Sequence, residues 1–310
     1  MNSRWLALAF ALWLAGCALR APSPDRFTFA VLGDTPYGEG EEREFPLMIE
    51  RINHAHVDFS IHVGDFKGSG DCSDALFAKR YAQFDTFAAP LIYTPGDNEW
   101  TDCRRTHMGS MDPLERLARL RTVFFSDRFS LGVTRLATEA QDACLAPPVA
   151  GCGCGAYPEN RSWEFRGVRF VTLNVPGSNN NVGFDAASDA EALCRNAANA
   201  RWLEGAADAA RAPGVRALVI AIQANPWDTN RPVYREFLAQ VEATARIGKP
   251  VLFIHGDTHT YRVDYPFTAP IRRLETFGSP FVGWVAVTVD PAHPELFVFQ
   301  PHLQKLVPPL

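Results

Sequence analysis

Short apolar runs alternate along the chain with longer segments of helical spacing. The runs are rich in β-branched and aromatic residues and nearly continuous in apolar character, which predicts strands buried on both faces. Strands are predicted over Phe27–Leu32, Phe59–Val63, Leu91–Thr94, Val168–Leu173, Ala217–Ile222 and Val251–Ile254. Helices are predicted over Glu42–Asn53, Ser73–Phe87, Pro113–Phe125, Asp189–Ala210 and Pro232–Ile247. This alternation predicts an α/β protein with right-handed crossovers.

The pattern changes after residue 270. Strands are predicted there without helices between them, over Arg272–Phe277, Phe281–Val289 and Glu295–Phe299. We therefore expect the chain to end in an antiparallel meander. No low-complexity linker or internal repeat interrupts the sequence, and 310 residues is a normal length for one large α/β domain. We expect a single domain over 17–310, with a Cys-, Gly- and Pro-rich loop or small insertion at 142–160.

The first residues have the features of an export signal. Arg4 supplies a positive charge, Trp5–Leu14 is apolar, and Leu14-Ala15-Gly16-Cys17 closes the run. A charged start, an apolar stretch of about 7–15 residues and a small-residue exit describe a secretory signal peptide, here residues 1–16. The exit resembles a bacterial lipobox, in which the cysteine is lipidated. An ordinary signal peptide with a chance cysteine at its end is the alternative interpretation.

The lipobox resemblance implies an exported protein that is anchored to the bacterial cell envelope through a lipid on Cys17. Ala18, in place of an aspartate, favours the periplasmic side of the outer membrane by resemblance to other lipoproteins. The apolar run is too short for a bilayer core, which takes about 20 residues, and no second run of spanning length follows. We therefore expect a membrane-anchored protein without a membrane-spanning helix.

The cysteine count fits an oxidising compartment. The chain has seven cysteines, and a lipid on Cys17 leaves an even number that allows up to three disulfides. The spacing of Cys152 and Cys154 could bind metal, but a structural zinc site needs a second ligand pair, which the sequence does not offer. Disulfides are the better interpretation. The six remaining cysteines are Cys72, Cys103, Cys144, Cys152, Cys154 and Cys194.

The charge pattern argues against a nucleic-acid partner. Domains that bind nucleic acid are usually basic, with lysine and arginine clustered on one face. This chain has a formal net charge of −5 and no basic patch with interleaved aromatic residues. We therefore expect no nucleic acid among its partners.

Candidate chemistry lies where predicted strands end, because four of these strands run into a Gly-Asp pair. Glycine lets the backbone turn and lets a ligand come close, and ligands of α/β sheets bind at the carboxyl ends of the strands. Carboxylates that converge there need cations to neutralise them. One Gly-Asp pair would be an ordinary turn, but the repeated pattern predicts a metal site. The pairs are Gly33-Asp34, Gly64-Asp65, Gly96-Asp97 and Gly256-Asp257.

In order and spacing, these motifs resemble those of the calcineurin-like metallophosphoesterase superfamily over residues 27–262. That family carries Asp-x-His, Gly-Asp-x-x-Asp, Gly-Asn-His-Asp/Glu, a lone His and Gly-His-x-His, and here every motif is altered. Asp34 matches the first aspartate, while Pro36 stands where its histidine belongs. Asp65 matches the metal-bridging aspartate, while Gly68 replaces the last aspartate of that motif.

The later motifs depart further from the family. Asp97 stands at the asparagine ligand, Asn98 at the histidine that assists the leaving group, and Glu99 at the acidic position. Asp257 replaces the first histidine of the last motif, and His259 matches the second. Because lost ligands are partly replaced by other ligands, the changes favour a re-tuned site over a dead one.

The resemblance implies two divalent cations. The family's lone histidine would fall near Gln223 and Asn225, and which of these replaces it stays open. One imidazole among hard oxygens favours Mn²⁺ or Mg²⁺, and Ca²⁺ is also compatible. The implied ligands are Asp34, Asp65 and His259 for one cation, and Asp65, Asp97, Asp257 and Gln223 or Asn225 for the other.

The resemblance also implies a fold and a reaction. The fold is a sandwich of central mixed β-sheets flanked by helices, with antiparallel strands at the C-terminal end. The reaction is metal-dependent hydrolysis of a small phosphate ester, a monoester or diester, outside the cytoplasm, with a water activated by the cations. The alternative is a non-catalytic envelope lipoprotein that keeps the phosphoesterase fold to bind a metal or a partner.

Proton donation to the leaving group is the step that the altered motifs put in doubt. The amide of Asn98 cannot act as a general acid, and losing that function costs about 10²–10⁴-fold in rate. His255, two residues before Asp257, is a candidate proton donor. A buried histidine at a strand end is the commoner meaning of such a position.

One disulfide can be predicted from the motifs. Cys72 comes seven residues after Asp65, and Cys103 comes six residues after Asp97. If the strands before these motifs are neighbours, both cysteines lie in adjacent loops, and a bridge would limit the motion of the segments that hold the two carboxylates. The four other cysteines would pair among themselves, with their connectivity left open.

Overall fold

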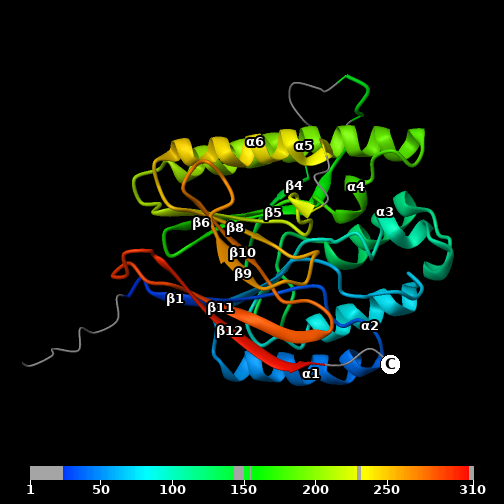
Figure 1. Ribbon diagram of the computed structural model, residues 1–310, viewed down its shortest axis with the longest axis horizontal. Coiled ribbons are helices and arrows are strands. Elements are labelled where there is room, and N and C mark those ends of the chain that lie inside the picture. The colour runs from blue at the N-terminus through cyan, green and yellow to red at the C-terminus, as the bar shows by residue number, and fades with distance from the viewer. Residues whose placement is uncertain (1–23, 143–149, 154, 229–231, 307–310) are drawn as a thin grey trace, which may run out of the picture.

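The computed structural model describes residues 24–142, 150–153, 155–228 and 232–306. Two β-sheets stack in the middle of the molecule, and helices cover their outer faces (Figure 1). One sheet has the strand order β12-β11-β1-β2-β3, and the other has the order β4-β5-β6-β7-β8-β10-β9. Both sheets mix parallel and antiparallel pairs. The predicted sandwich of mixed sheets flanked by helices is therefore confirmed.

Most elements begin and end within a few residues of the predicted ranges. The strands are β1 (Phe27–Leu32), β2 (Phe59–His62), β3 (Leu91–Tyr93), β4 (Glu139–Gln141), β5 (Tyr157–Phe165), β6 (Val168–Thr172), β7 (Ala217–Ala221), β8 (Val251–His255), β9 (Arg262–Asp264), β10 (Ile271–Glu275), β11 (Phe281–Val289) and β12 (Phe297–Leu306). The α-helices are α1 (Glu39–His54), α2 (Asp74–Phe84), α3 (Pro113–Phe124), α4 (Gly177–Asn180), α5 (Ala186–Ala210) and α6 (Arg235–Ala243). The 3₁₀ turns are η1 (Thr101–Arg104), η2 (Thr106–Met108), η4 (Pro232–Tyr234) and η5 (Thr244–Ile247).

The strands are apolar throughout because both faces of each sheet are covered. Phe29 of β1 and Phe59 of β2 stack with ring centroids 5.1 Å apart, and both rings meet Phe170 of β6 edge-on across the space between the sheets. Helices α1, α2 and α3 pack on the outer face of the five-stranded sheet. Helices α5 and α6 pack on the outer face of the seven-stranded sheet.

Side-chain caps fix where the helices that flank the site begin. Ser73 accepts a hydrogen bond from Leu76 N at the start of α2, and Asp112 accepts one from Leu114 N at the start of α3. Asp185 accepts one from Ser188 N at the start of α5. Each cap satisfies a backbone N–H that the helix itself leaves unpaired. The loops between strand ends and helices therefore have defined lengths.

The predicted C-terminal meander is wrong in part. β10 belongs to the seven-stranded sheet, where it pairs in parallel with β8 and antiparallel with β9. β11 and β12 form an antiparallel pair in the other sheet, with β11 beside β1. β10 is covered on both sides, since Ile271 packs under the helices and Leu274 packs between the sheets. The chain therefore changes sheets between β10 and β11.

The strand β5 was missed because its sequence is polar. Tyr157–Phe165 begins inside the range expected to be a loop, so the loop ends earlier than residue 160. Glu159 and Asn160 are fully buried, and their polar atoms are paired. Glu159 accepts hydrogen bonds from Arg121 of α3, and Asn160 donates to Asn199 of α5. Buried hydrogen bonds here replace the apolar pattern that usually reveals a strand.

Candidate active site

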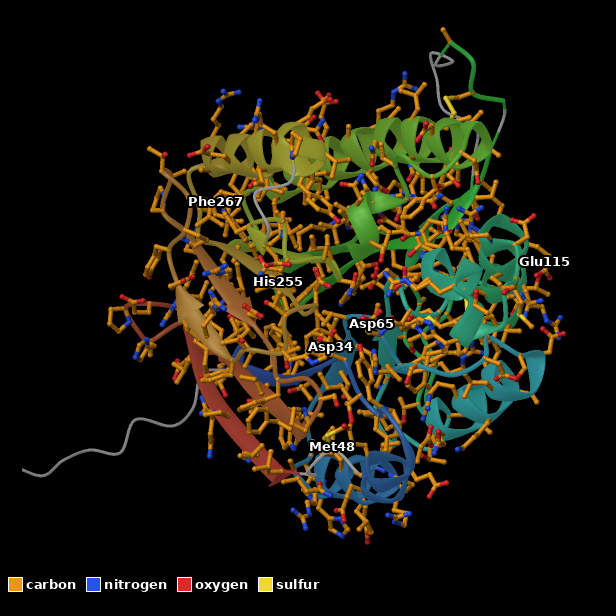
Figure 2. All side chains as sticks on the ribbon, turned by 45° about the vertical axis from the view of Figure 1, so that its right-hand side comes forward. Asp34, Met48, Asp65, Glu115, His255 and Phe267 are labelled. Carbon is orange, nitrogen blue, oxygen red and sulfur yellow. A yellow bond between two sulfur atoms is a disulfide. The ribbon has the colours of Figure 1, made fainter. Side chains whose placement is uncertain are left out.

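The carboxylates of the four Gly-Asp pairs gather at the carboxyl ends of the strands. Asp34 follows β1, Asp65 follows β2, Asp97 comes after β3 and Asp257 follows β8. The first two turns are joined by a hydrogen bond from Asp34 N to Gly64 O (3.0 Å). Asp34 and Asp65 lie near the middle of the molecule (Figure 2). The structure therefore brings together side chains that lie far apart in the sequence.

The backbone at the site is held in an uncommon conformation. Asp34, Asp65, Asp257 and His259 have φ angles of 51°, 54°, 77° and 58°. Side-chain-bearing residues rarely adopt this left-handed region, although aspartate tolerates it better than most. Such conformations persist where the surrounding structure fixes them, and they cluster at functional sites. The turns at the strand ends thus direct these side chains toward the site, and the left-handed backbone costs conformational free energy.

Two glycines of the motifs make room for the carboxylates. A Cβ atom on Gly96 would lie 2.0 Å from Asp65 Oδ1, and one on Gly256 would lie 2.1 Å from Asp34 Oδ2. Neither contact is sterically tolerable, so both positions require glycine. The glycine of one Gly-Asp pair therefore leaves space for the carboxylate of another pair, which explains why the dipeptide recurs.

The side chain of Gln223, just after β7, lies among three of the carboxylates. Its Nε2 atom donates to Asp65 Oδ2 (3.1 Å), Asp97 Oδ1 (3.1 Å) and, at 3.4 Å, Asp257 Oδ1. Its Oε1 atom accepts a hydrogen bond from Gly177 N (2.6 Å). The amide is fully buried. Gln223 therefore connects the ends of β2, β3 and β8 by hydrogen bonds.

His259 faces Asp34. Its Nε2 atom lies 3.8 Å from Asp34 Oδ1, and its Nδ1 atom lies 2.6 Å from Ser279 O. Since a carbonyl oxygen can only accept, Nδ1 carries the proton, and Nε2 presents its lone pair toward Asp34. A histidine whose Nδ1 is tied to a carbonyl is the usual state of a metal-binding imidazole.

Asn98 and Tyr37 surround the carboxylate of Asp65. Tyr37 Oη donates to Asp65 Oδ2 (2.9 Å), and Asn98 Nδ2 donates to the same oxygen (3.1 Å) and to Tyr37 Oη (2.8 Å). The backbone N–H of Asn98 donates to Asp65 Oδ1 (3.0 Å). Asn98 therefore orients Asp65 and Tyr37, while its role toward a leaving group stays a prediction.

The site opens into a cavity of about 310 Å³. Ser178 Oγ lies 2.6 Å from both Asp97 Oδ2 and Asp102 Oδ1, and Arg105 donates to the same hydroxyl at 3.1 Å. A serine hydroxyl has one proton, so it can donate to one of these two carboxylates at a time. The cavity is lined by Tyr37, Asp65, Asp97, Asn98, Asp102, Arg105, Gly177, Ser178, Asn225, Asp228, Tyr234, Asp257 and His259.

Burial dominates the electrostatics of the cluster. It raises the pKa of Asp34 well above the ordinary value, and the charge of Asp257 raises this pKa further. Burial and the charge of Asp97 have the same effect on the pKa of Asp65. The pKa of Asp102 rises to about 6, mainly through burial and then through Asp97. Carboxylates gathered in this way favour binding protons or cations.

Two charged side chains support the site from behind. Glu99 Oε1 accepts hydrogen bonds from Asp65 N (3.1 Å), Gly96 N (2.8 Å) and the hydroxyl of Tyr93 (2.7 Å). The buried ammonium of Lys67 donates to Gly68 O (2.9 Å) and Asn98 O (3.0 Å). Glu99 thus fixes the turns that present Asp65 and Asp97, and Lys67 places a positive charge beside them.

His255 and Asn225 are two further residues that the sequence nominates for the site. His255 is fully buried beside Phe253 and Trp227, and burial lowers its pKa to about 3. It is not among the described residues that line the cavity, and its role as proton donor stays a prediction. Asn225 N donates to Asp257 Oδ2 (2.8 Å), and its Nδ2 donates to the hydroxyl of Thr258 (2.8 Å).

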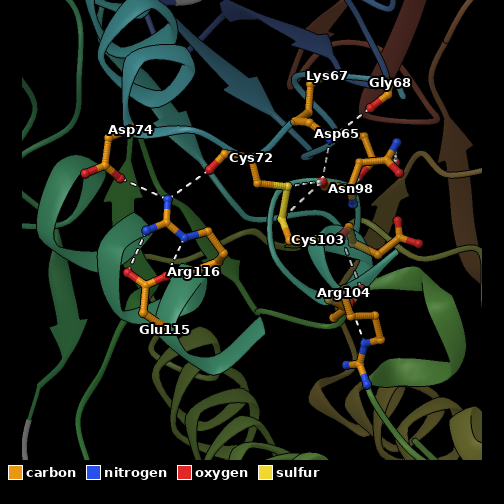
Figure 3. The surroundings of a disulfide bond; sticks show 12 residues. Asp65, Lys67, Gly68, Cys72, Asp74, Asn98, Cys103, Arg104, Glu115 and Arg116 are labelled. Atoms are coloured by element: carbon orange, nitrogen blue, oxygen red, sulfur yellow. Dashed lines mark hydrogen bonds and ion pairs between the residues drawn. A yellow bond between two sulfur atoms is a disulfide. The ribbon is translucent and has the colours of Figure 1, made fainter. Parts of the chain in front are cut away.

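The predicted disulfide between Cys72 and Cys103 is confirmed. The two Cα atoms are 5.8 Å apart, and the bridge lies beside Asn98 (Figure 3). It joins the loop after Asp65 to η1, which follows Asp97. Cys152 and Cys194 form a second disulfide, with Cα atoms 5.5 Å apart. Cys144 and Cys154 lie outside the described residues, so their predicted pairing is not tested.

Sequence reasoning missed several residues of the cavity wall. Tyr37 comes three residues after Asp34, and Asp102 and Arg105 come five and eight residues after Asp97. Each therefore lies in a loop that directly continues a strand-end motif. Ser178 differs from these residues, because the polar run Asn174–Asn181 after β6 can be identified from the sequence as one that could line the crevice, although a polar turn is its commoner meaning. A short separation from a motif along the loop is the signal that could have identified Tyr37, Asp102 and Arg105.

Among the described residues, no group of three or more His, Cys, Asp or Glu side chains is arranged so that it could hold a metal ion. The carboxylates bind N–H and O–H groups instead. Asp34 and His259 nevertheless have the chemistry of cation ligands, because the Nε2 lone pair faces a carboxylate oxygen across 3.8 Å. Asp65 Oδ1 accepts one hydrogen bond, from Asn98 N.

Comparisons with known proteins show the fold. No protein-family model and no curated protein sequence matches this chain. A dimetal phosphatase from Danio rerio matches with a TM-score of 0.57 and 12% identity, over 89% of this chain and 96% of that one. Two weaker matches are a predicted phosphoesterase from Streptococcus pneumoniae (TM-score 0.34, 10% identity, 89% of this chain and 98% of that one) and the sulfate thiohydrolase SoxB from Thermus thermophilus (TM-score 0.44, 13% identity, 90% and 56%).

The chain therefore has the fold of metallophosphoesterases. At 12% identity, the likeness establishes the fold and leaves the activity to be argued from the site, because one fold can host many functions. The candidate site lies at the carboxyl ends of the strands, where α/β proteins bind their ligands.

Proposed function

We propose that this protein hydrolyses a phosphate ester in the cavity, with the help of divalent cations. The observation that carries the proposal is the set of buried carboxylates beside His259, whose Nε2 lone pair faces Asp34 at 3.8 Å. The cavity of about 310 Å³ suits a small phosphorylated substrate, a monoester or diester. The metallophosphoesterase fold supports this chemistry as an analogy.

Asp34, Asp65 and His259 are the residues that would hold a cation, and the sequence resemblance adds a second cation at Asp97 and Asp257. The oxygen-rich donor set favours Mn²⁺ or Mg²⁺ and is compatible with Ca²⁺. When bound, such cations neutralise phosphate charge and acidify a water molecule.

The protein's own side chains have separate tasks in this proposal. Arg105 at the cavity wall carries a guanidinium that can bind phosphate oxygens through two parallel hydrogen bonds. Burial and the charge of Asp65 raise the pKa of Tyr37 well above the ordinary value, so its hydroxyl stays protonated and donates. Asn98 holds Tyr37 and Asp65 in place. A leaving group that needs a proton receives none from the amide of Asn98.

The proposal places the reaction outside the cytoplasm, on a protein anchored to the bacterial envelope through a lipid on Cys17. Residues 1–17 carry this argument and lie outside the described residues. The two disulfides support it, because stable disulfides are characteristic of oxidising compartments. Among the described helices, none combines the length and the hydropathy that a bilayer span requires.

The test is hydrolysis of an aryl phosphomonoester and an aryl phosphodiester by the purified protein. We expect hydrolysis when Mn²⁺ is added. Chelation should abolish this activity, and restoring Mn²⁺ should recover it. Asp34→Asn is expected to lower kcat/KM by on the order of 10–100-fold or more. Asp208→Asn is the matched control, since Asp208 is exposed on α5 and pairs with Arg211.

The outcomes separate the proposal from its alternative. Hydrolysis that survives Asp34→Asn unchanged would place the chemistry elsewhere in the molecule. Failure to cleave either ester with Mn²⁺, Mg²⁺ or Ca²⁺ would contradict the proposal and favour a non-catalytic binding protein with this fold.

A further inference from the structure

The geometry around Gln223 bears on how many cations the cavity can hold. Three carboxylate oxygens, from Asp65, Asp97 and Asp257, point at the same nitrogen at 3.1, 3.1 and 3.4 Å. These oxygens belong to the residues that the sequence resemblance assigns to a second cation. The Nε2 atom of Gln223 lies between the oxygens that this cation would need as ligands.

The orientation of the amide is fixed by its neighbours on both sides. Carboxylates only accept hydrogen bonds, so they require the NH₂ group. Gly177 N only donates, and it lies 2.6 Å from Oε1, so it requires the oxygen. If the amide turned so that Oε1 faced a cation, its NH₂ group would face the N–H of Gly177, and two donors would then oppose each other. The buried N–H of Gly177 would lose its acceptor, which costs free energy. Gln223 therefore donates hydrogen bonds to the carboxylates, and it presents no lone pair to a cation among them.

Asn225, the other candidate ligand, is also committed elsewhere. Its backbone N–H donates to Asp257 Oδ2 at 2.8 Å, and its Oδ1 accepts from Trp227 N at 3.1 Å. Its Nδ2 is bonded to Thr258. The backbone N–H of Asn225 and the side-chain amide of Gln223 thus both donate to the acidic cluster, while the side-chain amide of Asn225 contacts Thr258 and Trp227.

The other half of the cluster is arranged differently. Asp34 accepts hydrogen bonds from the backbone N–H of Asp257 at 3.0 and 3.1 Å and faces the unprotonated Nε2 of His259. The Nε2 lone pair of His259 and the carboxylate of Asp34 are both electron-pair donors, so a cation can bind between them. Lys67 Nζ donates to Asn98 O at 3.0 Å. Its positive charge offsets part of the negative charge of the carboxylates, so less of that charge remains for a second cation to neutralise.

We propose that the cavity binds one divalent cation, at Asp34, Asp65 and His259, and that the Gln223 amide takes the place of the second. The inference rests on the proposed function, because it concerns the same site. It changes the expected stoichiometry from two cations to one. It also assigns Gln223 as a positioning residue that holds Asp65, Asp97 and Asp257 together without metal.

The test measures Mn²⁺ binding to the full protein by equilibrium dialysis with metal analysis, and by electron paramagnetic resonance of the bound ion. The wild type is expected to bind one Mn²⁺ per chain with the spectrum of an isolated ion. Gln223→His, which supplies a ring nitrogen, is expected to bind two with a spin-coupled spectrum. Gln223→Glu, close in size to glutamine, gives a second variant in case the histidine does not fit.

Gln83→His is the matched control, because Gln83 is bonded to Arg80 on α2 and does not belong to the cavity wall. It is expected to bind one cation, as the wild type does. Two coupled Mn²⁺ ions in the wild type would overturn the inference and leave the proposed function standing. A single ion in both folded Gln223 variants would show that Gln223 does not exclude the second cation, and would also overturn it. No bound cation in the wild type would contradict the proposed function itself.

Discussion

At the scale of single residues, the site depends on backbone conformation as well as on side-chain chemistry. Asp34, Asp65 and Asp257 have left-handed backbones. The carboxylate of Asp65 lies so close to Gly96, and that of Asp34 so close to Gly256, that neither glycine has room for a Cβ atom. Replacing either glycine by alanine would force one strand end away from another. Such a substitution would therefore disturb the positions of the carboxylates more than the packing of the hydrophobic core.

Asn98 gives a prediction about the leaving group. Since its amide cannot donate a proton in the manner of a general acid, good leaving groups should react faster than alkoxides by on the order of 10²–10⁴-fold. The measurement is the dependence of kcat/KM on leaving-group pKa across a series of aryl and alkyl phosphate esters. We expect a steep dependence for the wild type and a shallower one for Asn98→His. A flat dependence in the wild type would mean that another residue supplies the proton.

The residues that sequence reasoning identified and missed differ in a physical way. Asp34, Asp65, Asp97 and Asp257 each follow an apolar run and a glycine, so one-dimensional pattern is enough to find them. The orientation of Gln223 depends on Gly177 N, which is 46 positions away in the sequence. No local pattern encodes such a contact, and so the amide's role emerges from the structure.

At the scale of elements, strand ends and the loops that follow them act as units. The Cys72–Cys103 disulfide ties the loop after Asp65 to η1, and Arg116 of α3 donates to Cys72 O (2.9 Å) on the same side (Figure 3). Ser178, Asn179, Asn180 and Asn181 have φ angles of 42°, 58°, 53° and 64°. That left-handed turn presents Ser178 to the cavity, and Arg195 of α5 anchors it through Asn180 (2.6 Å).

The disulfide beside the site gives a prediction about stability and activity together. Its residues are 31 apart in the sequence, so the double variant C72S/C103S should lower the free energy of unfolding by about 3–4 kcal/mol in the chain-entropy model. It should also lower hydrolysis, because Asp65 and Asp97 lose a shared constraint. Urea unfolding and the ester assay measure the two effects.

The second disulfide is the matched control for that experiment. C152S/C194S removes a bridge of similar kind, between residues 42 apart, that joins the segment before β5 to α5. We expect a loss of stability of the same order, about 3–4 kcal/mol, with hydrolysis of folded protein unchanged. An equal loss of activity in both double variants would show that general stability, and not the Asp65–Asp97 link, governs the site.

The elements were predictable where burial on both faces left an unbroken apolar run, as in β1 and β8. They were not predictable where buried polar side chains pair with one another, as Glu159 does with Arg121. The pairing of β10 with β8 was also missed, because the connection between these two strands, residues 256–270, contains no helix of the kind that usually marks a parallel crossover. Sheet membership is a property of tertiary packing, and neighbouring strands in sequence need not share a sheet.

At the scale of the whole molecule, two sheets with different strand orders present their carboxyl ends to one cavity. β1, β2 and β3 deliver Asp34, Asp65 and Asp97, while β7 and β8 deliver Gln223 and Asp257. The core between the sheets fixes this arrangement through aromatic contacts such as Phe29 with Phe170. A change in sheet packing would therefore separate the two halves of the site.

The location of the molecule gives a prediction of its own. Leu14-Ala15-Gly16-Cys17 resembles a lipobox, so Cys17→Ser should release the protein from the membrane fraction of cells that express it. Fractionation followed by a high-salt wash measures this, with the wild type as reference. Serine-variant protein that still pellets with washed membranes would show that Cys17 does not carry the anchor.

The position of the cation tests the central claim most directly. The measurement is an anomalous-difference map at the manganese absorption edge, from crystals of the wild-type protein grown or soaked with Mn²⁺. We predict a peak bounded by Asp34, Asp65 and His259, with the Gln223 amide still among the carboxylates of Asp65, Asp97 and Asp257. The absence of any peak at this acidic cluster would contradict the account of the cavity as a cation-dependent phosphoesterase site.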